Sequence, residues 1–181
     1  MKRMSKIKKL VIASMFSALC CISTLLVQIP TATQGYLHLG DALVLLCGWL
    51  LGPLWGGLAA GIGSMLADVF GGFALYAPAT FLIKGAVAVL AWVLQHLLRP
   101  FMLKHEILLL TISGTLAEVV MVCGYFLFEA LFCGYGMAAI VGVPANIVQA
   151  VFGVIVGTML THLMERMHLR ERFIFNNQIK Y

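Results

Sequence analysis

Four ionisable side chains interrupt the long apolar runs of this sequence: Asp68, Lys84, Glu118 and Glu129. A charge at the centre of a bilayer costs about 2.5–3.5 kcal/mol on insertion scales, so such residues face the protein interior, pair with one another or line a ligand path. Helical spacing indicates that some of them converge. Glu118 and Glu129 are eleven residues apart, almost three full turns, and share a face with Tyr125. This pattern predicts a polar site inside an apolar bundle of helices.

Amides and aromatic rings extend the predicted site. Asn146 and Gln149 are three residues apart and share a helix face, where two amides supply donors and acceptors together. Aromatic faces with a few convergent polar groups are typical of a site for a small, flat, polar molecule. The predicted substrate contacts are Lys84, Glu129, Asn146, Gln149, Asp68, Tyr36, His38, Tyr76 and Tyr125. The site is more acidic than basic, which favours a neutral or weakly cationic heterocycle.

Several of these residues also have a purely structural interpretation. Lys84 could simply pair with Asp68 or Glu129 and hold helices together. Glu118 could be a protonated, hydrogen-bonded structural residue, and His38 could be a solvated loop residue. Both interpretations stay open at the level of sequence.

The composition indicates which elements must position the site. The chain is 62% hydrophobic and only 10% charged, whereas soluble domains are about 25% charged. A membrane span needs about 20 apolar residues, so residues 1–181 allow about six spans. We predict an all-α membrane protein, a single domain with a bundle of six transmembrane helices. The predicted spans cover residues 8–27, 41–51, 54–69, 79–98, 107–131 and 137–164.

Local signals support these boundaries. Asp41 is expected to cap the second span, because its carboxylate can accept backbone N–H groups. Gly52-Pro53 predicts a tight turn between the second and third spans. Pro144 is expected to loosen the sixth span and free a carbonyl. The second span is weak as an independent spanning helix, so we expect it to be short or tilted.

The positive charges predict the orientation. Eleven of the twelve Lys and Arg residues lie in the N-terminal tail, in the short break at Arg99 and Lys104, or in the C-terminal tail. Such clusters mark the cytoplasmic side of a membrane protein, so both termini are predicted to be cytoplasmic. The loops 28–40 and 70–78 hold no Lys or Arg, and are predicted to face outside and roof the site.

Several functions are disfavoured by missing motifs. The chain has no phosphate-binding loop, no H-E-x-x-H or G-x-S-x-G motif and no C-x-x-C pair. We therefore expect no enzymatic activity, no metal site and no cofactor, and nucleic-acid binding is also disfavoured. An enzyme using Glu118 and Glu129 would hold them about 16 Å apart along one helix, too far to flank one bond. An autonomous facilitator or channel, and a ligand-free structural subunit, remain alternatives.

Four segments resemble the S components of energy-coupling factor (ECF) vitamin transporters. They are residues 36–42, 52–68, 76–85 and 143–149, and they occur in the family's order over nearly the whole chain. The sequence looks most like the riboflavin-type family, which includes transporters proposed for pyridoxine and hydroxymethylpyrimidine. The resemblance implies a six-helix protein of a prokaryotic plasma membrane that binds a vitamin or precursor from outside. Pyridoxine or hydroxymethylpyrimidine is favoured, and riboflavin or another vitamin is the alternative.

The resemblance also implies partners. An S component docks on a membrane coupling subunit that two cytoplasmic ATPase subunits drive. In the family, small residues of the first helix contact that coupling subunit, and the matching positions here are Ser14 and Ala18. The family usually has Ala at the first position, so Ser14 is a mild departure.

Overall fold

Five α-helices and one short β-ribbon form the chain in the computed structural model, which describes residues 5–30 and 36–167. The helices are α1 (Lys6–Leu26), α2 (Asp41–Phe70), α3 (Ala77–Leu98), α4 (Glu106–Leu131) and α5 (Val143–Arg166), and the 3-10 segments are η1 (Arg99–Phe101) and η2 (Gly136–Gly142). Strands β1 (Ile29–Pro30) and β2 (Tyr36–Leu37) pair antiparallel. All five helices are long and apolar enough to cross a membrane. Part of the predicted 28–40 loop and the outermost charges of both tails (Lys2, Arg3, Arg170, Arg172, Lys180) lie outside the described residues.

Helix α2 consists of two arms joined at Gly52. This residue has φ 81° and ψ 179°, a backbone conformation outside the helical range that glycine adopts without a Cβ clash. A Cβ on Gly56 would overlap the carbonyl oxygen of Cys47, although nine residues of straight helix would separate these positions by about 13 Å. The chain therefore reverses direction at the turn predicted for Gly52-Pro53. The predicted spans 41–51 and 54–69 correspond to the first and second arms of α2.

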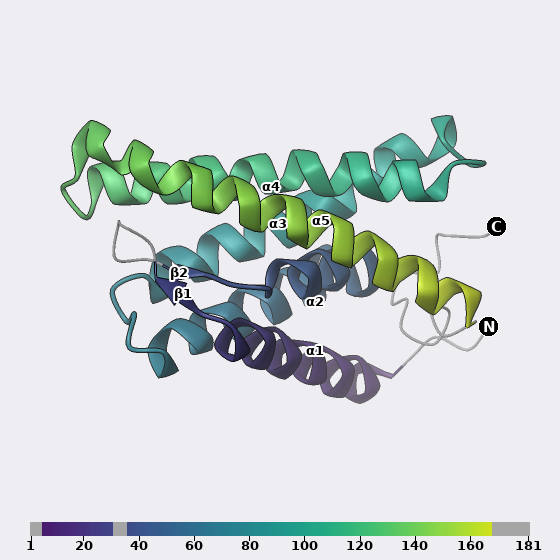
Figure 1. Cartoon of the computed structure of the whole chain (residues 1–181). Coiled ribbons are helices and arrows are strands. Elements are labelled where there is room, and N and C mark those ends of the chain that lie inside the picture. Colours follow the sequence, from purple (N-terminus) through teal and green to yellow (C-terminus); the bar gives the residue numbers. More distant parts are fainter. Residues whose placement is uncertain (1–4, 31–35, 168–181) are drawn as a thin grey trace.

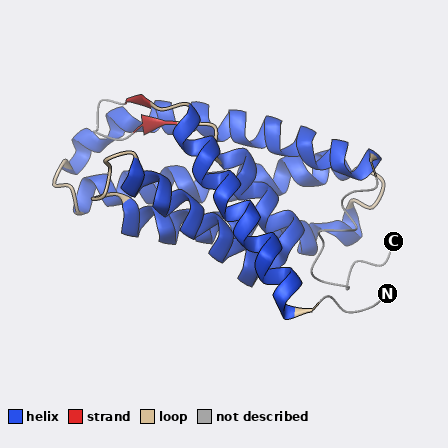
Figure 2. Ribbon diagram, turned by 90° about the horizontal axis from the view of Figure 1, so that it is seen from below, coloured by secondary structure: helices blue, strands red, loops and turns tan. Residues whose placement is uncertain are grey.

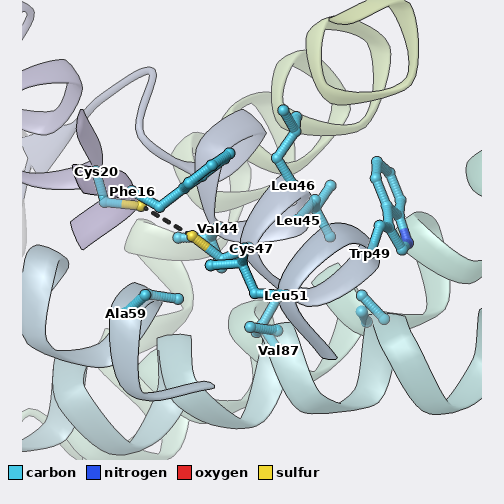
Figure 3. Close-up of a cluster of buried hydrophobic side chains, with 14 of the residues drawn as sticks. Phe16, Cys20, Val44, Leu45, Leu46, Cys47, Trp49, Leu51, Ala59 and Val87 are labelled. Atoms are coloured by element: carbon cyan, nitrogen blue, oxygen red, sulfur yellow. Dashed lines mark hydrogen bonds between the residues drawn. The ribbon is translucent and has the colours of Figure 1, made fainter. Parts of the chain in front are cut away.

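The first arm of α2 is the centre of the bundle. About 72% of the α2 span is buried, against 28–39% for the other four. Figure 3 shows its side chains Val44, Leu45 and Trp49 in the core, with Cys47 facing Cys20 of α1 at an Sγ–Sγ distance of 3.6 Å. A Cβ on Gly48 would overlap the backbone of Ala88, so this glycine lets α3 approach closely. The short second span predicted from the sequence is thus a core helix that its neighbours enclose.

One prediction about local structure is wrong, the loosening of the sixth span by Pro144. The candidate span Gly136–Arg166 agrees with the predicted 137–164, but its first part is η2, and α5 starts at Val143 with Pro144 in its first turn. Proline is tolerated there because the first-turn N–H groups have no partner within the helix, so Pro144 begins a helix rather than loosening one. The 28–40 loop also contains the β1–β2 ribbon, in which Ile29 pairs with Leu37.

The bundle has two chemically different ends (Figures 1 and 2). The ribbon end carries β1–β2 and the turns after α2 and α4, while the start of α1 and the finish of α5 lie at the opposite, terminal end. The described basic residues other than Lys84 belong to the first turns of α1, to the connection between α3 and α4 and to the last turn of α5, which Figure 1 places at the terminal end: Lys6, Lys8, Lys9, Arg99, Lys104 and Arg166. Among the described residues, the loops of the ribbon end contain no Lys or Arg.

Candidate functional site

A small cavity lies at the ribbon end, where five segments of the chain converge. The residues that line it are Tyr36, His38, Asp68, Tyr76, Thr80, Tyr125, Glu129, Asn146 and Gln149. Every one of them carries a polar group, and none is aliphatic. The cavity volume is about 30 Å³, enough for one or two water molecules. All the predicted site residues except Lys84 are in this lining, and Thr80 is the addition.

Beneath the cavity, a buried ion pair joins Lys84 of α3 to Asp41 of α2. Gln149 of α5 donates from Nε2 to the second oxygen of Asp41 at 2.7 Å. The Lys84 ammonium also lies 5.3 Å from the ring centroid of Tyr125. We call Asp41, Lys84 and Gln149 the floor of the site. It connects three helices through charged hydrogen bonds, the strong kind.

The floor differs from two interpretations of the sequence. The structural alternative for Lys84 paired it with Asp68 or Glu129, and it pairs with Asp41 instead. Asp41 was expected to cap its helix, but α2 is capped by Gly40 without a side-chain hydrogen bond. A Cβ on Gly153 would lie 2.7 Å from the Cβ of Asp41. This glycine therefore lets α5 approach Asp41 closely, and the Asp41 carboxylate, although in the first turn of α2, is buried.

His38 connects the ribbon to the floor. Its backbone N–H donates to Oε1 of Gln149 at 3.0 Å, and its ring Nδ1 accepts from the N–H of Gly40 at 3.0 Å. Burial lowers the pKa of His38 to about 4, and the charge of Lys84 acts in the same direction. The ring is therefore neutral near pH 7, and because Nδ1 accepts a bond, the proton is on Nε2.

The side walls of the cavity are built by tyrosines and carboxyl groups. The Tyr36 hydroxyl donates to Oδ1 of Asp68 at 2.6 Å, and the Tyr76 hydroxyl donates to Oε1 of Glu129 at 3.3 Å. Burial and the nearby Asp68 raise the pKa of Tyr36 above its usual value, so it remains a donor. Oδ2 of Asp68 is buried and has no hydrogen-bond partner among the described residues.

Other polar side chains of the site face inward as well. Thr80 and Tyr125 share a hydrogen bond between their hydroxyls at 3.0 Å. Asn146 is half-buried one helical turn before Gln149, on the face that the sequence predicted. The sequence also held a signal for Thr80, since it lies one turn before Lys84 in the predicted span.

Glu118 lies outside the cavity lining, although it shares the buried face of α4 with Tyr125 and Glu129 as predicted. Both of its carboxyl oxygens are buried and lack a hydrogen-bond partner among the described residues. The hydrogen bonds considered for Glu118 are therefore not formed among the described residues.

The predicted docking residues are small side chains on α1 and do not line the cavity. Ser14 and Ala18 are exposed on α1, one turn apart. At the neighbouring Ser17 the backbone of α1 packs closely on α2, because a Cβ on Gly63 would overlap the carbonyl oxygen of Ser17. No other described part of the chain covers the Ser14–Ala18 face of α1.

One cluster among the described residues has the geometry of a possible metal site. Glu106 of α4 with His162 and Glu165 of α5 place three ligand atoms within 4.8 Å of one another. All three are half-buried, and they join the start of α4 to the last turns of α5, away from the cavity. Sequence reasoning missed this cluster, because Glu106 is far from the other two residues in the chain.

The chain is similar to proteins of a known membrane-transport family. Residues 4–166 match the family model described as ECF-type riboflavin transporter, S component. A Pyrococcus woesei protein described only as an uncharacterized protein in the gap 3′ region is 39% identical over 146 residues, covering 80% of this chain and 93% of that one. The thiamine precursor transporter HmpT of Lactococcus lactis subsp. cremoris is 29% identical over 162 residues, covering 88% and 89%.

A solved structure supports the fold. It is described as the S component of a bacterial ECF transporter and superposes with a TM-score of 0.66 at 20% sequence identity, covering 91% of this chain and 99% of that one. The family model spans most of the chain, including every described helix. The chain therefore belongs to the ECF-type riboflavin transporter S component family, integral membrane proteins that bind a small vitamin and associate with a membrane-embedded ECF module.

Proposed function

We propose that this protein captures a small vitamin or vitamin precursor from outside the cell in the cavity at the ribbon end, and delivers it to an ECF module. The observation that carries this proposal is the convergence of nine polar side chains from five segments on one cavity. Within the membrane-spanning part of a protein, polar groups are costly and mark ligand sites. Of the nine polar side chains, only Gln149 hydrogen-bonds to the ion pair of the floor, so the others are available for other roles.

The favoured substrate is pyridoxine or hydroxymethylpyrimidine. A lining without aliphatic side chains suits a small ring that is polar on every edge. The HmpT relative, named as a thiamine precursor transporter, supports the same size class. Riboflavin is the second candidate, because the matching family model carries its name.

The orientation follows from the charges. With basic residues at the terminal end and none in the described loops of the ribbon end, the terminal end is cytoplasmic and the ribbon end faces outside. The two arms of α2 then count as separate crossings, one of them short, which gives six crossings and cytoplasmic termini.

Binding requires the ribbon end to open. Ligand pockets commonly measure 300–1,000 Å³, whereas this cavity holds about 30 Å³. The β1–β2 ribbon and the turn between α2 and α3 carry Tyr36 and Tyr76 at the edge of the cavity. Movement of these two segments admits the ligand, and their return closes the site over it.

Delivery depends on docking through α1. Ser14 and Ala18 would contact a membrane coupling subunit that works with two cytoplasmic ATPase subunits. Ala18→Trp should abolish co-purification with the ECF module while leaving ligand affinity unchanged, because a large ring prevents close helix packing. Leu116→Trp, on the exposed face of α4, is the matched control. Full co-purification of the Ala18→Trp variant would refute the docking surface.

The binding function itself is tested by mass spectrometry of small molecules released from gently purified, denatured protein. Titration of ligand-free protein with pyridoxine, hydroxymethylpyrimidine, riboflavin and thiamine then ranks the candidates. One vitamin recovered at near-equal molar amount supports the proposal. Binding of none of them would contradict it, and uptake into liposomes without ATPase subunits would favour an autonomous facilitator.

A further inference from the structure

Asp68 and His38 each direct a polar group into the cavity that no complementary group of the described residues meets, and the chemistry of these two groups is complementary. Asp68 is only 4% exposed, and Tyr36 occupies one of its oxygens. The other oxygen, Oδ2, has no hydrogen-bond partner among the described residues. Buried acceptors are rarely left unsatisfied in native proteins, so an acceptor of this kind on a cavity wall indicates a ligand that carries a donor.

His38 supplies the opposite group. Its Nδ1 accepts from Gly40, so the neutral ring carries its proton on Nε2. Nε2 of Gln149 lies 3.4 Å away but is itself a donor, directed at Asp41 at 2.7 Å. Two donors cannot bond to each other, so the Nε2–H of His38 needs an acceptor that the described residues do not provide.

These two groups belong to one side of the cavity. The Tyr36 ring lies 5.4 Å from the His38 ring, centroid to centroid, while its hydroxyl bonds to Asp68. Two other pairs of the lining bond to each other, Thr80 with Tyr125 and Tyr76 with Glu129. One wall of the cavity thus presents a free acceptor and a free donor on either side of a tyrosine ring.

We infer that Asp68 and His38 are the specificity-determining residues of the site, and that the ligand is a small heteroaromatic compound with a donor and an acceptor on one edge. The donor, an amino, hydroxyl or protonated ring-nitrogen group, bonds to Oδ2 of Asp68. The acceptor, such as an unprotonated ring nitrogen, receives the Nε2–H of His38. This inference rests on the proposed function and adds the chemical pattern that the site selects.

The test compares ligands that differ only in this pattern. One pair is 4-amino-5-hydroxymethyl-2-methylpyrimidine and its 4-oxo analogue, in which donor and acceptor exchange positions on the ring edge. The other pair is pyridoxine and its analogue without the 3-hydroxyl group. Calorimetric titration of the purified full chain should show tighter binding of the amino or hydroxyl compound in whichever pair binds. The expected preference is roughly 10- to 100-fold, the value of a hydrogen bond to a charged group.

Two variants assign the preference to residues. Asp68→Asn keeps an acceptor for Tyr36 and places an amino group where Oδ2 was, so the preference should disappear or reverse. His38→Asn keeps an acceptor for the Gly40 N–H but removes the Nε2–H, so the preferred compound should bind roughly 10-fold more weakly. Glu118→Gln is the matched control, a buried carboxyl outside the cavity lining whose amide should leave both affinities unchanged.

The outcomes separate this inference from the proposed function. Wild-type protein that binds a vitamin without discriminating within its pair, or an Asp68→Asn variant with the wild-type preference, overturns the inference and leaves the proposed function intact. Binding of no compound of the vitamin panel overturns both. If Asp68→Asn does not fold, the His38→Asn variant still tests the inference. An unchanged affinity of that variant for the preferred compound contradicts it.

Discussion

The floor and the wall of the cavity use buried polar groups in opposite ways. In the floor, Asp41, Lys84 and Gln149 satisfy one another in a connected network. In the wall, Oδ2 of Asp68 has no hydrogen-bond partner among the described residues, and the Nε2–H of His38 meets only the donor Nε2 of Gln149. The floor therefore holds α2, α3 and α5 together, and the wall is left open to a ligand. An ionisable residue in a membrane span can therefore be assigned to structure or to ligand binding only once its hydrogen-bond partners are known.

We expect the largest loss of stability from a variant that breaks the ion pair of the floor. Lys84→Met leaves the carboxylate of Asp41 buried without its cation, and breaking a buried ion pair costs about 3–5 kcal/mol. The measurement is the free energy of unfolding in mixed micelles under increasing denaturing detergent. The double variant Asp41→Asn with Lys84→Met removes both charges and should recover much of the loss. A single variant as stable as wild type would show that the floor is not structural.

We expect the free energy of unfolding to depend on pH through His38, which lies between floor and wall. His38 has a folded pKa of about 4 against an ordinary value of 6.5. The unfolded chain therefore binds a proton that the folded protein excludes between these values, and stability falls as pH drops from 6.5 to 4. The full loss is about 3 kcal/mol, measured as unfolding midpoints across that range. In His38→Asn this part of the pH dependence should vanish, and an unaltered profile would contradict the assignment.

We expect the smallest change in stability from a variant of the wall. In Asp68→Asn the amide oxygen still accepts from Tyr36, and no paired charge is orphaned, so the free energy of unfolding should change by less than about 1 kcal/mol. Thermal unfolding of ligand-free protein measures this change. A loss as large as that of Lys84→Met would remove the distinction between floor and wall.

Much of the fold could be predicted from the sequence, because long apolar runs and the Gly52-Pro53 signal are local. The short first arm of α2 was also foreseen as a weak independent span. The β1–β2 ribbon was not, since strands of two residues carry no alternating pattern. The role of Pro144 was predicted wrongly, because it was assigned to a helix interior and lies in the first turn of α5, directly after η2.

The candidate site was predicted as a set of residues but not as a set of bonds. Helical spacing says which side chains share a face of one helix, and it brought Tyr125 and Glu129 together correctly. It does not say which helices are neighbours. The pairing of Lys84 with Asp41, 43 residues earlier, depends on how α2 and α3 pack around Gly48. The sequence therefore offered no basis for choosing Asp41 over Asp68.

The most direct test of this account is an experimental structure of the protein with its bound vitamin. The account predicts a ligand atom within hydrogen-bond distance of Oδ2 of Asp68 and another near Nε2 of His38, with the ion pair of Lys84 and Asp41 intact below. A ligand bonded to Lys84, with that pair broken and Asp68 still without a partner, would contradict the division between a structural floor and a binding wall.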